Sequence, residues 1–111
     1  MLLQLNAIGF LAKDAVINSH NENKVINFTV AVNEQYKKDG EKREKTTFID
    51  CAYWTDKTGI VPHLLKGTMV HIQGSPESKL VEPPEGKPYA KLSLKISSVN
   101  LLSSSKKNNQ Q

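Results

Sequence analysis

Apolar and polar residues alternate with a period of two along most of this chain, and no other feature limits the possible folds as strongly. In the segment VINFTVAVN, the even-numbered residues from Ile26 to Val32 are apolar, and most of their neighbours are polar. In YAKLSLKIS, Leu92, Leu94 and Ile96 alternate with serines and lysines. Such a strand has one face in a core and the other in water. The pattern therefore predicts an all-β protein.

Five strands are predicted, at about residues 3–11, 25–33, 46–56, 68–74 and 89–97. One short helix of about two turns is predicted over residues 58–67, because Pro62 suits only a first helical turn and Gly67 suits a left-handed cap. The Asp39-Gly40 pair within residues 37–45 is typical of a hairpin or a long loop, and residues 81–88 form a turn-rich connector. These elements match an OB-fold, a five-stranded Greek-key β-barrel with one short helix between strands 3 and 4.

The length of 111 residues fits a single domain, predicted over residues 1–102. Residues 103–111 contain no apolar side chain to bury and are predicted to be a polar disordered tail. No apolar run approaches the roughly 18 residues that cross a membrane, and the apolar start lacks the basic leader and cleavage site of a signal peptide. A single cysteine, Cys51, cannot form an internal disulfide, which favours the cytoplasm.

The segment TTFIDCAYWTD holds three of the aromatic residues of the chain, including its one tryptophan. Its alternation places Ile49, Cys51 and Tyr53 on one face, and Phe48 and Trp54 with an acid between them on the other. The second face is not a core face. Two rings six residues apart lie roughly 20 Å apart on a strand, so a flexible polymer could cover both. Single-stranded nucleic acid suits them, because stacking on an aromatic ring contributes about 1–3 kcal/mol per base. The alternative is that these rings cover a barrel end or a subunit interface.

The formal net charge of +4 is concentrated in residues 37–45, which hold five bases and three acids, and in two lysines near the end. The rest of the chain is balanced, so the basic segment is either a contact for an anionic polymer or a solvated loop. Lysines beside aromatic residues suit a stacked strand whose phosphates need neutralising. The predicted binding residues are Tyr36, Lys37, Lys38, Arg43, Lys45, Phe48, Trp54, Lys79, Tyr89, Lys91 and Lys95.

No constellation of residues predicts an enzyme. His20, His63 and His71 show no metal-ligand spacing, and the chain contains neither CxxC nor HExxH. Cys51 lies on the predicted core face and reads as a small buried hydrophobe. We therefore expect no catalytic residue, no metal and no cofactor.

Several segments together resemble the bacterial single-stranded DNA-binding protein family: LNAIGFLAKD, VINFTVAVNEQY, TTFIDCAYW, LLKGTMVHIQG and LSLKISSVNLL. They cover residues 5–102 in the order and at the spacing of that family. The resemblance implies an OB-fold subunit, usually a homotetramer, that wraps single-stranded DNA without sequence preference during replication, recombination and repair. It also implies that Tyr36, Phe48 and Trp54 are stacking aromatics.

Four departures from the family pattern change what can be carried over. The hairpin before the last strand offers only Leu80 and Val81 where the family has an aromatic, so one stacking platform fewer is expected. Asp50 stands where some relatives carry a basic residue, so it should weaken contact with phosphates. Ala15 replaces a proline of the family pattern. Cellular members end in a long tail with an acidic, hydrophobic tip that recruits other proteins. Here either that tail is missing, or the chain is a phage, plasmid or mobile-element version or a paralogue, so recruitment is not carried over.

Two rival functions remain open at this point. A primosomal accessory protein is another short OB protein, often dimeric, that mainly holds proteins together at restart forks; the chain length and tail favour it, whereas FIDCAYW and LLKGTMVHIQG favour the single-strand binder. An OB module that binds a protein or a saccharide would not need cations beside its aromatic residues. A homo-oligomer is expected, with the tetramer favoured and a dimer as the alternative.

Overall fold

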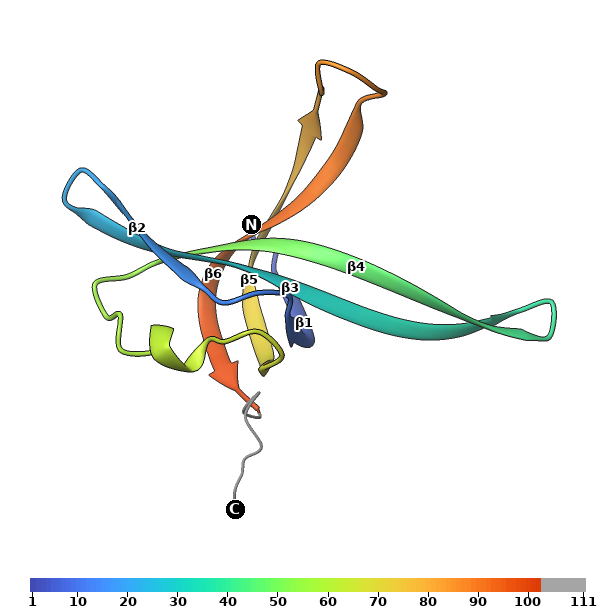
Figure 1. Ribbon diagram of the computed structural model, residues 1–111, viewed down its shortest axis with the longest axis horizontal. Helices are drawn as coiled ribbons and strands as arrows, with labels where there is room; N and C mark the ends of the chain where they lie inside the picture. The colour runs from blue at the N-terminus through green and yellow to red at the C-terminus, as the bar shows by residue number, and fades with distance from the viewer. Residues whose placement is uncertain (103–111) are drawn as a thin grey trace.

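The computed structural model describes residues 1–102, except for the side chains of Tyr89 and Ala90. Within that range six strands form one sheet (Figure 1). They are β1 (Leu5–Leu11), β2 (Val16–His20), β3 (Asn23–Lys38), β4 (Glu41–Trp54), β5 (Met69–Val81) and β6 (Tyr89–Leu101). The predicted tail, residues 103–111, lies outside the described residues.

Five of the strands close into a barrel. Neighbouring strands follow the order β1-β5-β6-β4-β3, and β1 returns to β3 through the pairs Phe10↔Ala31 and Leu11↔Val30. These pairings are antiparallel except for β4 with β6, which run parallel at Asp50↔Ser93. The all-β OB-fold prediction is confirmed.

The barrel has the five strands that were predicted, and one further strand, β2, was not predicted. After β1, the amide of Ala12 donates to the carbonyl of Thr29 (2.8 Å), and the chain pairs with β3 again as β2, starting at Val16↔Asn27. Strands β1 and β2 therefore follow the same edge of β3, one after the other. Strand β2 was not predictable from alternation, because its five residues are all exposed and carry no alternating apolar face. The first strand also begins at Leu5 rather than residue 3.

The predicted two-turn helix is a single 3-10 turn, η1 (Val61–His63), between β4 and β5. Pro62 lies in the first turn as expected, but the backbone of Leu64 already leaves the helical region, at φ −93° and ψ 70°. Leu64 is fully buried, and Gly67 takes the left-handed conformation that was predicted, with φ 89°. Packing of Leu64 into the core thus replaces a second helical turn.

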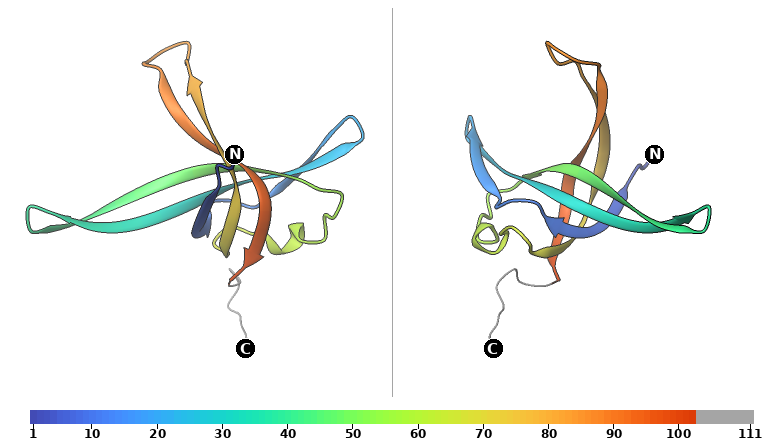
Figure 2. Two further views of the ribbon diagram at one scale, coloured as in Figure 1. Left: turned by 180° about the vertical axis from the view of Figure 1, so that it is seen from behind. Right: turned by 45° about the vertical axis from the view of Figure 1, so that its right-hand side comes forward.

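The basic segment 37–45 is a hairpin and not a loop. Strands β3 and β4 pair as far as Lys38↔Glu41, and only Asp39 and Gly40 form the turn, both with positive φ (55° and 80°). Two such residues are typical of a tight type I′ turn. The result is a long two-stranded arm, and the β5–β6 hairpin projects from the barrel in another direction (Figure 2).

The barrel interior is filled by the inward-facing residues that the alternation predicted. Its buried side chains are Leu11, Ile26, Phe28, Val30, Ile49, Cys51, Leu64, Val70, Ile72, Leu94 and Ile96. Gly74, beside a β-bulge, allows β5 to approach the backbone of β6 closely, since a Cβ there would collide with the carbonyl of Lys95. The core fixes which face of each strand remains outside.

Candidate nucleic-acid interface

Both aromatic rings of interest point out of the barrel. Phe48 is 59% exposed and Trp54 is 46% exposed, whereas Ile49 and Cys51 on the other face of β4 are buried. Tyr53 is half-buried and packs against the core. The predicted face assignment for this strand is therefore confirmed.

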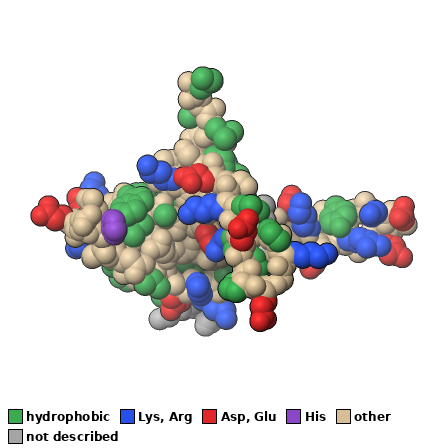
Figure 3. Space-filling model, turned by 90° about the horizontal axis from the view of Figure 1, so that it is seen from above, with side chains coloured by type: hydrophobic (Ala, Val, Ile, Leu, Met, Phe, Trp, Pro, Cys, Tyr) green, Lys and Arg blue, Asp and Glu red, His purple; other side chains and the backbone are tan. Residues whose placement is uncertain are grey.

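An open trough lies beside Trp54, between the outer face of β4 and the β5–β6 hairpin. Its volume is about 510 Å³, and it joins a second hollow of about 420 Å³ on the β2 side through shared residues that include Asn27, Asp50 and Lys91. Phe48 lies two residues before Asp50 on the same face of β4. Figure 3 shows Lys and Arg side chains, with acidic ones among them, at the centre of one face and along the β3–β4 arm.

The trough and the hollow that it joins share a polar floor that crosses three strands. Thr29, Asp50 and Ser93 are register partners on β3, β4 and β6, and they form one row. The next row holds Asn27, Ala52 and Lys95. A floor of hydroxyl, carboxylate and amide groups can hydrogen-bond the edges of bases, but it cannot serve as a core.

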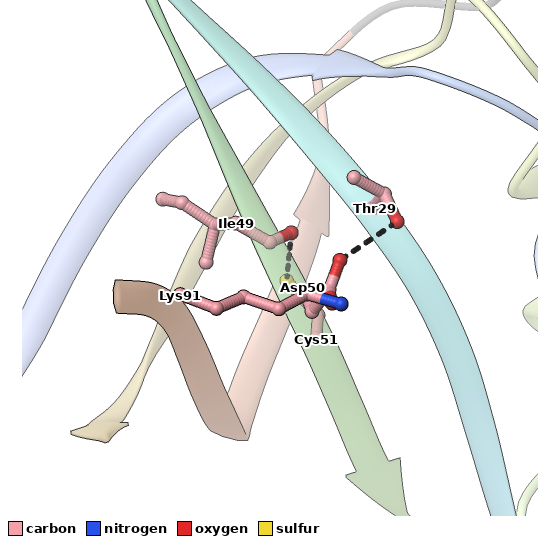
Figure 4. A network of polar contacts seen from close by, with 5 residues as sticks. All are labelled: Thr29, Ile49, Asp50, Cys51 and Lys91. Atoms are coloured by element: carbon pink, nitrogen blue, oxygen red, sulfur yellow. Dashed lines mark hydrogen bonds and ion pairs between the residues drawn. The ribbon is translucent and has the colours of Figure 1, made fainter. Parts of the chain in front are cut away.

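Asp50 is the centre of a small polar network (Figure 4). The Thr29 hydroxyl donates to Asp50 Oδ1 (3.2 Å), and the Lys91 ammonium forms an ion pair with Asp50 Oδ2. Both partners of the ion pair are partly exposed. The carboxylate therefore offsets positive charge inside the trough, which gives a structural basis for the expected weakening of phosphate contact by Asp50.

Three of the predicted lysines line this trough together. Lys79 and Lys91 are direct cross-strand partners on the β5–β6 hairpin, and Lys95 lies further along β6. Like charges placed directly opposite one another destabilise a hairpin. Asp50 offsets part of that repulsion through its ion pair with Lys91, and a phosphate beside Lys79 would offset more of it.

The other predicted cations lie on the β3–β4 arm, away from the trough. Tyr36 is opposite Arg43, and Lys37 is opposite Lys42, a second pair of like charges. By the strand alternation, Tyr36 and Phe48 belong to opposite faces of the ribbon. Five predicted residues make up this arm group: Tyr36, Lys37, Lys38, Arg43 and Lys45. Tyr89 is placed on β6 opposite Val81, but its side chain lies outside the described residues.

Cys51 lies under the floor of the trough as a buried free thiol. Burial, together with the smaller effect of the neighbouring Asp50 carboxylate, raises the pKa of Cys51 to about 12. Its Sγ donates to the carbonyl of Ile49 (3.5 Å). A thiol with so high a pKa stays protonated and is a poor nucleophile.

Among the described residues, no group of His, Cys, Asp or Glu could hold a metal ion. A helix long and apolar enough to cross a membrane is likewise absent from residues 1–102.

Sequence reasoning missed several residues of this surface. Asn27, Thr29 and Ser93 on the trough floor could have been identified by their alternation, but their register opposite β4 could not. Phe10 is also exposed on the outer face, at 41%. The alternation of β1 carried that signal, since Leu5, Ala7 and Leu11 face inward.

Comparison with known proteins gives consistent matches along the chain. The sequence matches the profile of the Single-strand binding protein family over residues 3–102. A Staphylococcus epidermidis protein named Single-stranded DNA-binding protein is 29% identical over 110 residues, which cover 99% of this chain and 83% of the relative.

Two solved structures share the fold. The Plasmodium falciparum SSB in complex with ssDNA has a TM-score of 0.77 at 21% identity, over 93% of this chain and 97% of that one. The small single-stranded DNA-binding protein from Streptomyces coelicolor has a TM-score of 0.73 at 18% identity, over 89% and 93%.

Proposed function

The chain belongs to the single-strand binding protein family, and from that premise we propose that it binds and protects single-stranded DNA without sequence preference. The observation that carries the proposal is the pair of outward rings, Phe48 and Trp54, beside an open trough with three lysines on its wall. Flat rings accept any base, and ammonium groups neutralise phosphates of any sequence.

The positions of the side chains assign base stacking and phosphate neutralisation to different residues. Bases stack on Trp54 and Phe48 of β4, while Lys79, Lys91 and Lys95 neutralise the phosphates on the hairpin side. The arm group extends the contact, with Tyr36 as a further ring and Lys37, Lys38, Arg43 and Lys45 as cations. Tyr89 belongs to the proposed set through its position on β6.

The biological role is replication, recombination and repair, the processes in which members of this family act. The proposal is one of binding without catalysis, with a homo-oligomer as the working particle, a tetramer in preference to a dimer. We place the protein in the cytoplasm, because its one cysteine is a free thiol.

The primosomal accessory function is not favoured. It was suggested by chain length and tail composition, whereas the family match extends from residue 3 to residue 102. The lysine-lined trough also supports a protein whose main ligand is DNA.

The test is an equilibrium titration of a labelled oligothymidine, followed by anisotropy, beside a duplex of the same length. We expect tight binding to the single strand, weak binding to the duplex, and competition by single strands of unrelated sequence. Equal affinity for both forms, or no binding to the single strand, would contradict the proposed function.

A further inference from the structure

Two exposed phenylalanines flank one alanine in a row that crosses three strands. Phe10 of β1 pairs with Ala31 of β3, and Ala31 pairs with Phe48 of β4. Register partners project from the same face of a sheet. Phe10 therefore shares the outer face with Phe48 and lies on the side of β3 opposite to it.

The spacing of this row suits a nucleobase. Neighbouring strands lie about 4.8 Å apart, so the Cα atoms of Phe10 and Phe48 are roughly 10 Å apart. Stacked bases repeat at about 3.4 Å, so one base between two rings needs roughly 7 Å and two bases need roughly 10 Å. The small side chain of Ala31 leaves this space open above β3, with an apolar floor.

The apolar row is narrow on β3 and β4. On one side lies the pair Thr29–Asp50, joined by a hydrogen bond of 3.2 Å, and on the other lies the pair Asn33–Thr46, joined by one of 2.7 Å. On β1 the apolar surface is broader, because Ile8 (56% exposed) projects from the same face as Phe10. On β3 and β4 a strip one residue wide between hydrogen-bonding rows suits a flat base with polar edges.

The row is also continuous with the proposed DNA surface. Phe48 belongs to both, and the adjacent Thr29–Asp50 row forms part of the trough floor. Lys13, just beyond the end of β1, lines the same hollow as Thr29 and Asp50 and supplies a cation at that end.

We propose that Phe10 and Phe48 form a second base-binding site, the Phe10–Phe48 slot, which takes one or two unpaired bases from the strand that stacks on Trp54. This inference rests on the proposed function and adds a DNA contact on β1. It also restores the stacking platform that the sequence lacks in the β5–β6 hairpin.

The test compares substitutions at Phe10 that separate a flat ring from apolar bulk. Phe10→Leu should weaken binding to oligothymidine by about tenfold, the amount expected for loss of one stacked base, whereas Phe10→Tyr should bind like the wild type. Ala31→Leu fills the slot while keeping both rings and should weaken binding to a similar extent. Ile17→Ala on β2 is the matched control, because Ile17 is equally exposed (41%) and lines no hollow described above.

The outcomes are separable when the particle mass is measured without DNA for each variant. Weaker binding by Phe10→Leu and Ala31→Leu at unchanged mass supports the slot. Wild-type affinity of Phe10→Leu overturns it. A fall in mass that accompanies the loss of affinity also overturns it, since Phe10 would then belong to an interface with a second copy. If the wild-type protein itself fails to bind oligothymidine, the proposed function fails first and the slot fails with it.

Discussion

Asp50 of β4 and Lys91 of β6 form an ion pair on the floor of the trough, and Thr29 of β3 donates a hydrogen bond to the same carboxylate. A negative charge thus lies on the surface proposed to receive a polyanion. It holds the β5–β6 hairpin to the barrel, and it repels any phosphate that approaches the trough lysines. Asp50 should therefore limit the affinity of the protein for single-stranded DNA.

Asp50→Asn should tighten binding to oligothymidine about 2- to 5-fold, because a partly exposed charge contributes about 0.5–1 kcal/mol. Asparagine keeps an acceptor for Thr29, so the strand register should be unchanged. Anisotropy titrations over a range of salt would measure the effect, and we expect a steeper salt dependence. Glu22→Gln removes an acid that lines no hollow described above and should change little. Unchanged or weaker binding by Asp50→Asn would show that the carboxylate does not oppose DNA.

Trp54→Ala should weaken binding by about 1–3 kcal/mol through the loss of one stacking platform. Since the ring is only partly buried (46% exposed), the variant should stay folded, with a moderately lower midpoint of thermal unfolding. Trp54→Phe keeps a flat ring and serves as the control. An unfolded Trp54→Ala protein would mean that the indole supports the core instead.

Lys95→Gln should reduce the salt dependence of binding. Each phosphate neutralised on a single strand contributes about 0.7 to the slope of log affinity against log salt. We expect the slope to fall by about that amount. Lys66→Gln is the control, because Lys66 follows η1 in the chain and lines neither hollow described above. Equal slopes for the wild type and Lys95→Gln would remove Lys95 from the phosphate contacts.

Much of this arrangement was predictable from alternation, because a period of two fixes which face of a strand is buried. That rule assigned Phe48 and Trp54 to the outside and Cys51 to the inside, and the structure confirms each assignment. It fails where a strand has no buried face, as in β2, and where both faces are polar, as in the arm beyond Asn33.

Contacts between strands were beyond the reach of sequence reasoning. Asp50 and Lys91 are separated by a long stretch of chain, and only the parallel pairing of β4 with β6 brings them together. The same holds for Phe10 and Phe48, which lie on either side of Ala31 because β1 closes the barrel against β3.

The high pKa of Cys51 predicts a loss of stability at alkaline pH. In the unfolded chain the thiol ionises near its ordinary value of 9.0, while burial in the folded state holds its pKa at about 12. Between these values the unfolded state loses a proton that the folded state keeps, so the free energy of unfolding should fall by about 1.4 kcal/mol per pH unit. Below pH 9 the thiol is protonated in both states, so the contribution of Cys51 to the free energy of unfolding does not change with pH.

Urea unfolding at pH 8, 9.5 and 10.5 would measure this, with Cys51→Ala as the comparison. The variant should be less stable at pH 8 but lose less stability as the pH rises, because the other titrating groups are the same in both proteins. Parallel pH profiles would show that the thiol is not held protonated by the fold.

The most direct test of the central claim uses the intrinsic fluorescence of Trp54, the one tryptophan of the chain. Oligothymidine added to the protein should quench the indole emission to a plateau at a defined ratio of nucleotides to protein, because a base stacks on the exposed ring. Full binding of the oligonucleotide, shown by anisotropy, with no change in that emission would contradict the account.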